Sequence, residues 1–137
     1  MEQAHLSMPG RATRRSDVEL RLPADNAYVS VLRTVASGLA ARLDFTIEDI
    51  EDLRMAISEA CALMLPMADH GSDLHAEFFL DEATITASVR VSTEHPTTID
   101  QGAWAWQVLN ALTAEATQSV SLGHVTLTLT MHSAVDV

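Results

Sequence analysis

The sequence predicts an α+β fold, a two-layer sandwich in which a mostly antiparallel sheet of about five strands carries three helices on one face. Three segments repeat apolar residues at the helical spacing of three and four, and five others alternate apolar with polar residues as half-buried strands do. The order is strand, helix, helix, strand, strand, helix, strand, strand. With 137 residues, the chain has the length of one compact domain.

The first half of the chain predicts one strand and two helices. The strand starts at Asp17, alternates apolar and polar residues, and is ended by Pro23. An amphipathic helix is predicted over residues 25–43. A second helix begins at Thr46, which has capping-box spacing to an aspartate three residues later, and it continues to Met64 before a proline closes it.

The second half predicts four strands and a third helix. Strands over residues 74–80 and 83–91 form a hairpin with its turn at Asp81 and Glu82. The remaining elements, in order, are a polar stretch over residues 92–102, a helix from Trp104 to near Thr117, and two strands over residues 118–122 and 124–132 that flank Gly123.

Composition and charge exclude several classes of protein. A hydrophobic fraction of 47% with 20% charged residues is typical of a globular domain. Eight arginines, no lysine and 19 acidic residues give a net charge of −11, which disfavours nucleic acid and suits a basic protein partner. Because the sequence has neither a membrane-spanning apolar run nor the apolar core of a signal peptide, we expect a cytoplasmic protein with no membrane contact.

We expect three regions along the chain. Residues 1–16 form a flexible N-terminal arm in which Arg11, Arg14 and Arg15 are solvated, residues 17–133 form the single domain, and residues 134–137 form a short tail. The lone Cys61 excludes an internal disulfide, and its place beside the apolar stripe of the second helix predicts a buried, inert thiol. The six histidines lack the convergent spacing of a zinc site, so no metal site is predicted.

One segment carries a family resemblance. Residues 22–61, and above all FTIEDIEDLRMAISEAC at residues 45–61, resemble the RsbW and SpoIIAB type anti-sigma factors, which are serine kinases of the GHKL, or Bergerat-fold, ATPase superfamily. The resemblance implies a GHKL-like fold and a cytoplasmic homodimer. It also implies that the protein holds an RNA polymerase sigma factor away from the polymerase and phosphorylates an anti-anti-sigma partner of the STAS type, through which it is released.

The resemblance also implies site residues. Glu59 matches the family's catalytic glutamate, although a lone glutamate on a helix is more often a surface charge. Leu63 stands where an asparagine should hold magnesium, and a leucine has no oxygen for a cation that takes only oxygen ligands. Thr126 matches a late nucleotide-binding threonine. Arg33 aligns with an arginine of the partner-binding helix, and it is equally compatible with a surface arginine lying over apolar neighbours.

The rest of the family's nucleotide site is altered. Ser92 and Glu94 occupy the two positions of the adenine-binding Asp-x-Gly motif, and of the glycine-rich lid that cradles phosphates only Gly102 remains, followed by bulky Trp104 and Trp106. We therefore name no cofactor and expect ATP and magnesium to be lost or only poorly bound.

Three functions follow from these observations. The leading interpretation is an anti-sigma factor that sequesters its sigma factor by binding, with a decayed kinase site. The alternative is an active ATP-dependent serine kinase, which would use Glu59 and Thr126. A third interpretation is a dimerising α+β domain that serves some other regulator.

Overall fold

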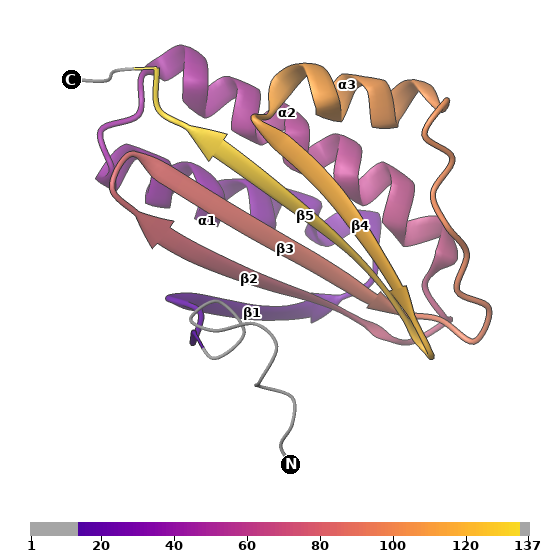
Figure 1. The fold of residues 1–137 in the computed structure, drawn as a ribbon. Helices are drawn as coiled ribbons and strands as arrows, with labels where there is room; N and C mark the ends of the chain where they lie inside the picture. Colours follow the sequence, from indigo (N-terminus) through magenta and orange to yellow (C-terminus); the bar gives the residue numbers. More distant parts are fainter. Residues whose placement is uncertain (1–13, 135–137) are drawn as a thin grey trace.

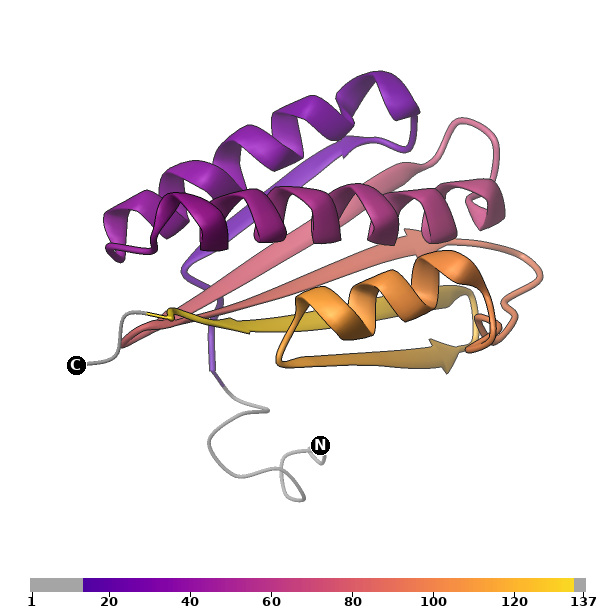
Figure 2. The same cartoon turned by 90° about the horizontal axis from the view of Figure 1, so that it is seen from above.

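The computed structural model describes residues 14–134. Its sheet has the order β1-β2-β3-β5-β4 with every neighbouring pair antiparallel, and three helices cover one side of it (Figures 1 and 2). The predicted two-layer α+β fold is confirmed. The strands are β1 (Val18–Pro23), β2 (Asp73–Asp81), β3 (Thr84–Ser92), β4 (Glu115–Ser121) and β5 (His124–His132). The helices are α1 (Val29–Arg42), α2 (Ile47–Met64) and α3 (Trp104–Leu112), with short 3-10 turns η2 (Asn26–Tyr28) and η3 (Leu65–Met67).

The core lies between the sheet and the helices. Alternate residues of the three central strands are fully buried on the helix side, among them Phe78, Ile85, Val89, Leu127 and Leu129. Helix α2 runs between α1 and α3 (Figure 2). Both α1 and α2 bury alanines completely, and these small side chains let the helices approach each other and the sheet closely.

Helix α2 begins as the sequence predicts. The hydroxyl of Thr46 accepts a hydrogen bond from the backbone N–H of Asp49 at 3.1 Å, and Glu48 and Asp49 place negative charge in the first turn. Both features stabilise a helix start, because they satisfy an otherwise unpaired N–H group and favour the positive end of the helix dipole. The predicted N-cap at Thr46 is confirmed.

Helix α3 is shorter than predicted. It ends at Leu112, and residues expected to be helical belong to β4, where Glu115 pairs with Thr130 and Ala116 with Leu129 of β5. The run Ala-Glu-Ala favours a helix by only a few tenths of a kcal/mol per residue over most alternatives. Pairing with a central strand outweighs that preference.

The two hairpins turn over two residues each. Asp81 pairs with Thr84, so the first turn consists of Glu82 and Ala83, one residue later than predicted. Ala83 takes the left-handed conformation with φ of 56°. The second turn contains Gly123 with φ of 85°, a conformation that costs glycine little, and Gly123 therefore separates the last two strands as expected.

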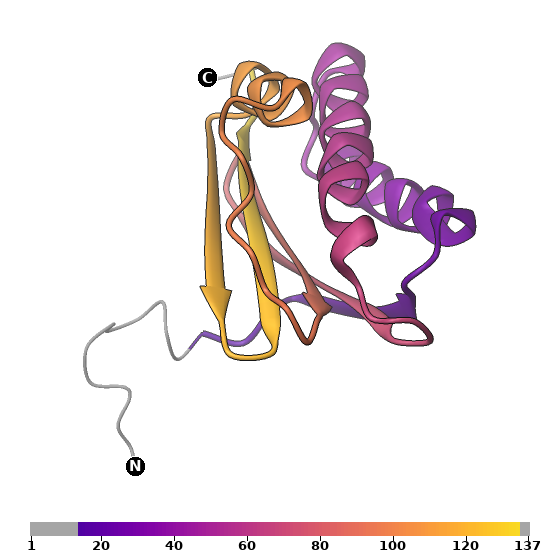
Figure 3. The ribbon, with the colours of Figure 1, turned by 90° about the vertical axis from the view of Figure 1, so that its right-hand side faces the viewer.

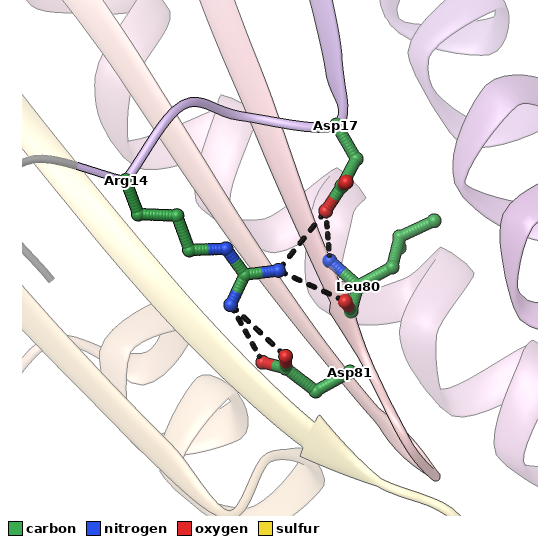
Figure 4. Close-up of polar contacts among 4 residues, drawn as sticks. All are labelled: Arg14, Asp17, Leu80 and Asp81. Atoms are coloured by element: carbon green, nitrogen blue, oxygen red, sulfur yellow. Dashed lines mark hydrogen bonds and ion pairs between the residues drawn. The ribbon is translucent and has the colours of Figure 1, made fainter. Parts of the chain in front are cut away.

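The expectation that Arg14 is solvated is wrong, because Arg14 fixes the chain ahead of β1 to the end of β2 (Figure 4). Its Nη1 donates to both carboxylate oxygens of Asp81 at 2.9 and 3.0 Å, and its Nη2 donates to Asp17 Oδ2 and to the carbonyl of Leu80. The N–H of Leu80 donates to Asp17 at 2.8 Å, and this bond, with help from Arg14, lowers the pKa of Asp17. Arg11, the rest of residues 1–13, and residues 135–137 lie outside the described residues.

Within residues 14–134, no helix combines the length and the apolar character needed to cross a bilayer.

Candidate functional site

Most positions that align with the family's nucleotide site lie on α2 and around the connection between β3 and α3, residues 93–103, which we call the β3–α3 connection. Glu59 and Leu63 are one turn apart on α2, and both are half-buried. Leu63 packs against the hydrophobic core. This part of α2 therefore offers a single carboxylate beside an apolar side chain. Leu63 has no oxygen atom that could coordinate magnesium together with Glu59.

The β3–α3 connection buries one of its residues, Ile99, and one residue of β4, Gln118, binds it there. Ile99 is only 5% exposed, and its backbone is held on both sides by the side chain of Gln118. The Oε1 atom of Gln118 accepts from the N–H of Ile99 at 2.7 Å, while its Nε2 donates to the carbonyl of Ile99 at 3.1 Å. We call this pair of bonds the Gln118 clamp, and it satisfies the N–H and the carbonyl of a buried residue.

The start of the same connection is tied to the segment after η3. The N–H of Asp69 donates to the carbonyl of Ser92 at 2.9 Å, and the carboxylate of Asp69 accepts from the N–H of Glu94 at 3.1 Å. Thr93 between them is 4% exposed and donates its N–H to the carbonyl of Gly123. The connection is thus fixed at its start and near its middle, and Figure 3 shows it rising beside β4 and β5 to the start of α3.

Near its end, the connection binds one of its own backbone N–H groups with one of its own side chains. The N–H of Gly102 donates to the carboxylate of Asp100 at 2.9 Å. Helix α3 then begins at Trp104, whose side chain is 79% exposed, whereas Trp106 is buried in the core. Trp106 therefore belongs to the core, and Trp104 stands at the surface.

Arg33 lies in a polar seam between α1 and α2. Its Nη1 donates to the hydroxyl of Ser58 at 3.2 Å, one residue before Glu59. Beside it, Arg54 of α2 donates to the hydroxyl of Ser37 at 3.2 Å, which in turn donates to the backbone carbonyl of Arg33. Arg33 is half-buried, and its guanidinium is positioned by α2 through Ser58.

Thr126 does not lie near Glu59. Its neighbours Val125 and Leu127 are fully buried on the helix side of β5, and the alternation of the strand therefore places Thr126 on the open face of the sheet. There it stands opposite Arg90 of β3 and Ser119 of β4. The structure thus separates Glu59 and Thr126 by the sheet itself.

Sequence reasoning missed the residues that hold the β3–α3 connection. Gln118 and Asp69 act through contacts between distant segments, which no local pattern reports. One signal was present: Gln118 is a polar residue at an inward-facing position of its strand, opposite the buried Leu127, and such a residue needs a buried hydrogen-bond partner. Cys61 is buried as predicted. In the described part of the chain, no three His, Cys, Asp or Glu side chains are grouped to hold a metal ion.

No family model matches the sequence. The sequence is similar to several RsbW serine-protein kinases. It is 48% identical over 44 residues to that of Bacillus velezensis, a match that covers 32% of this chain and 28% of the relative. It is 37% identical over 73 residues to that of Halalkalibacterium halodurans, which covers 53% of this chain and 45% of the relative. The chain thus matches less than half the length of these curated relatives.

A solved structure has the same fold. The crystal structure of the RsbU and RsbW domains of a Mycobacterium tuberculosis protein superimposes with a TM-score of 0.61 over 85% of this chain, which corresponds to 32% of that chain. The sequence identity in this comparison is 24%, so this likeness establishes the fold alone.

Proposed function

We propose that this chain, a relative of the RsbW-type serine-protein kinases, is an anti-sigma factor that acts by binding its partner and has lost the phosphate-transfer site. It sequesters an alternative RNA polymerase sigma factor in the cytoplasm. An anti-anti-sigma protein of the STAS type competes for it, and the working form is a homodimer on a GHKL-like scaffold.

The fixed β3–α3 connection is the observation that carries the loss of the kinase site. Phosphate groups are commonly bound by free backbone N–H groups near a helix start. Here the N–H groups of Glu94, Ile99 and Gly102 are already bonded to side chains of the chain itself. Leu63 beside Glu59 removes the oxygen ligand that magnesium would need. Both features favour a binding role over catalysis.

The outer surface of α2 is suited to a partner that is basic and carries exposed apolar side chains. Glu48 and Glu51 are exposed there, Asp52 is half-exposed, and Met55, about one turn further along the helix, is 52% exposed. Complementary charge speeds the encounter of two proteins, and an apolar side chain surrounded by charges can provide contact area once they meet. Arg54 links this surface to the polar seam around Arg33, because its Nε lies 3.8 Å from Glu51 and its Nη1 donates to Ser37.

Two measurements test the proposal. In the first, each sigma factor of the source organism is mixed with the protein and the pair is separated by size; we expect one of them to form a stoichiometric complex. In the second, the unfolding temperature is recorded with rising Mg-ATP. A ligand bound only to the folded state would stabilise it by about 2.7 kcal/mol at a hundredfold excess over Kd. Because the proposed protein has lost its nucleotide site, we expect no shift of the unfolding temperature.

Matched variants locate the binding surface. Arg33→Met keeps an apolar stem but removes the charge, and we expect it to weaken the sigma complex by roughly tenfold or more, as loss of an interface arginine can. Arg42→Met makes the same change at an exposed position at the end of α1 and should leave the affinity nearly unchanged. Far-UV circular dichroism checks that both variants fold.

Two results would count against the proposal. If no sigma factor forms a complex, the anti-sigma role is wrong. If Mg-ATP raises the unfolding temperature and phosphate moves to a protein substrate, the active kinase replaces the binding-only form, and Glu59→Gln should then abolish the transfer.

A further inference from the structure

No helix covers the other side of the sheet (Figure 3). The side chains that the strands direct to that side are mostly polar. One row of side chains that crosses its strands carries two arginines and a histidine. Arg21 of β1 is paired with His75 of β2, His75 with Arg90 of β3, and Arg90 with Thr126 of β5. Residues directly opposite each other in an antiparallel sheet share a face, so these side chains are close neighbours.

A hollow of about 310 Å³ lies at this row. Its lining combines two arginines, two histidines and two serines with one carboxylate: Arg21, Arg90, His75, His124, Ser72, Ser92 and Asp73. The whole chain has only eight cationic side chains against 19 acidic ones. Two of the eight arginines and two of the six histidines therefore meet in one hollow of a strongly acidic protein.

The charge of Arg90 is not neutralised by a carboxylate in the described structure. Its Nη2 lies 2.7 Å from Nδ1 of His75, and Nε2 of His75 lies 2.9 Å from a carboxylate oxygen of Glu19. A guanidinium can only donate, so Nδ1 accepts and the proton of this neutral imidazole is on Nε2, directed at Glu19. Arg90 is thus held in place by a neutral ring nitrogen.

The other arginine of the hollow is only weakly paired. Nε of Arg21 is 4.0 Å from Asp73, and the side chain is 70% exposed. An exposed pair at that distance contributes little, typically less than about 1 kcal/mol. Both guanidinium groups can therefore turn their N–H groups toward a ligand in the hollow.

We propose that this hollow binds the phosphate group of a small phosphomonoester, or free phosphate, through the guanidinium groups of Arg21 and Arg90 with Ser92 and His124 as further hydrogen-bond partners. Guanidinium matches the oxygens of phosphate in geometry and charge. The site is local, and the net charge of −11 around it repels an extended polyanion such as nucleic acid. The proposal does not rest on the proposed function.

Calorimetric titration tests the site at constant ionic strength, with inorganic phosphate and O-phosphoserine as probes and chloride as the reference anion. We expect saturable one-to-one binding. Arg90→Gln and Arg21→Gln should each weaken it roughly tenfold, because each removes one charge-assisted contact. Arg90→Lys should recover part of the affinity. Arg42→Gln changes the net charge equally on α1 and should have no effect.

Amide chemical shifts place the ligand. Perturbations centred on β1, β2 and β3 around Arg21, His75 and Arg90 support the site. Perturbations centred on α2 and the β3–α3 connection, or equal binding by the parent and Arg90→Gln, overturn it. If O-phosphoserine binds more tightly, the site recognises the esterified group; if the two probes bind equally, it recognises the free anion. Binding of Mg-ATP at α2 would contradict the proposed function and leave this site standing.

Discussion

Cys61 is the only cysteine of the chain, and it is 1% exposed beside a small cavity that residues of β1, α1 and β2 also line. Burial raises the pKa of the thiol from its ordinary value of 9.0 to about 11, against the opposing effect of the Arg33 charge. The neutral form is the stable one inside the protein. At neutral pH the residue is therefore a small apolar side chain, with little of the thiolate that reactivity requires.

The stability of the protein should consequently fall as the pH rises from about 9 to about 11. In this window the unfolded thiol has ionised while the folded thiol has not, so raising the pH favours unfolding. The loss amounts to roughly 2–3 kcal/mol. Urea denaturation at a series of pH values measures it, and Cys61→Ala should flatten this part of the profile. An equally steep decline in the alanine variant would assign the effect to other groups.

At the scale of the element, the β3–α3 connection depends on the Gln118 clamp. Gln118→Leu keeps the size of the side chain but leaves the buried N–H and carbonyl of Ile99 without partners. We expect the free energy of unfolding to drop by about 1–3 kcal/mol for each group left unsatisfied. Urea denaturation measures the loss, and hydrogen exchange at Ile99 should become much faster.

Gln107→Leu provides the matched control for the clamp, because Gln107 is exposed on α3. Substitutions of that kind usually change stability by less than about 0.5 kcal/mol. If Gln118→Leu and Gln107→Leu behave alike in both measurements, the clamp does not hold the connection.

Elements defined by local periodicity could be predicted, whereas their ends and their contacts could not. Helix α2 and the alternating strands follow from spacing and from the Thr46 cap. The residues after Leu112 favour a helix locally, and only pairing with β5 makes them a strand. The alternation of β5 already implied that Thr126 faces away from the buried side. The Gln118 clamp depends on a contact between a strand and a distant connection. The row through Arg90 depends on cross-strand register. The sequence states neither.

At the scale of the whole molecule, the net charge of −11 acts differently on the two proposed associations. Two copies of this chain repel each other, while a basic sigma factor is attracted. Salt screens both effects. We therefore expect added salt to tighten the homodimer and to weaken the sigma complex. Analytical ultracentrifugation of each at low and high salt measures this, and a sigma complex indifferent to salt would contradict the role given to charge.

The strand order also sets the order in which the sheet can assemble. The hairpins β2–β3 and β4–β5 close over two-residue turns, but β1 meets β2 only after the chain has passed through both α1 and α2. Closing a long loop costs more chain entropy, and such distant pairings slow folding. We therefore expect β1 to pair with β2 later than the two hairpins form. The bonds of Arg14 to Asp17, Leu80 and Asp81 stabilise the pairing of β1 with β2 once it has formed.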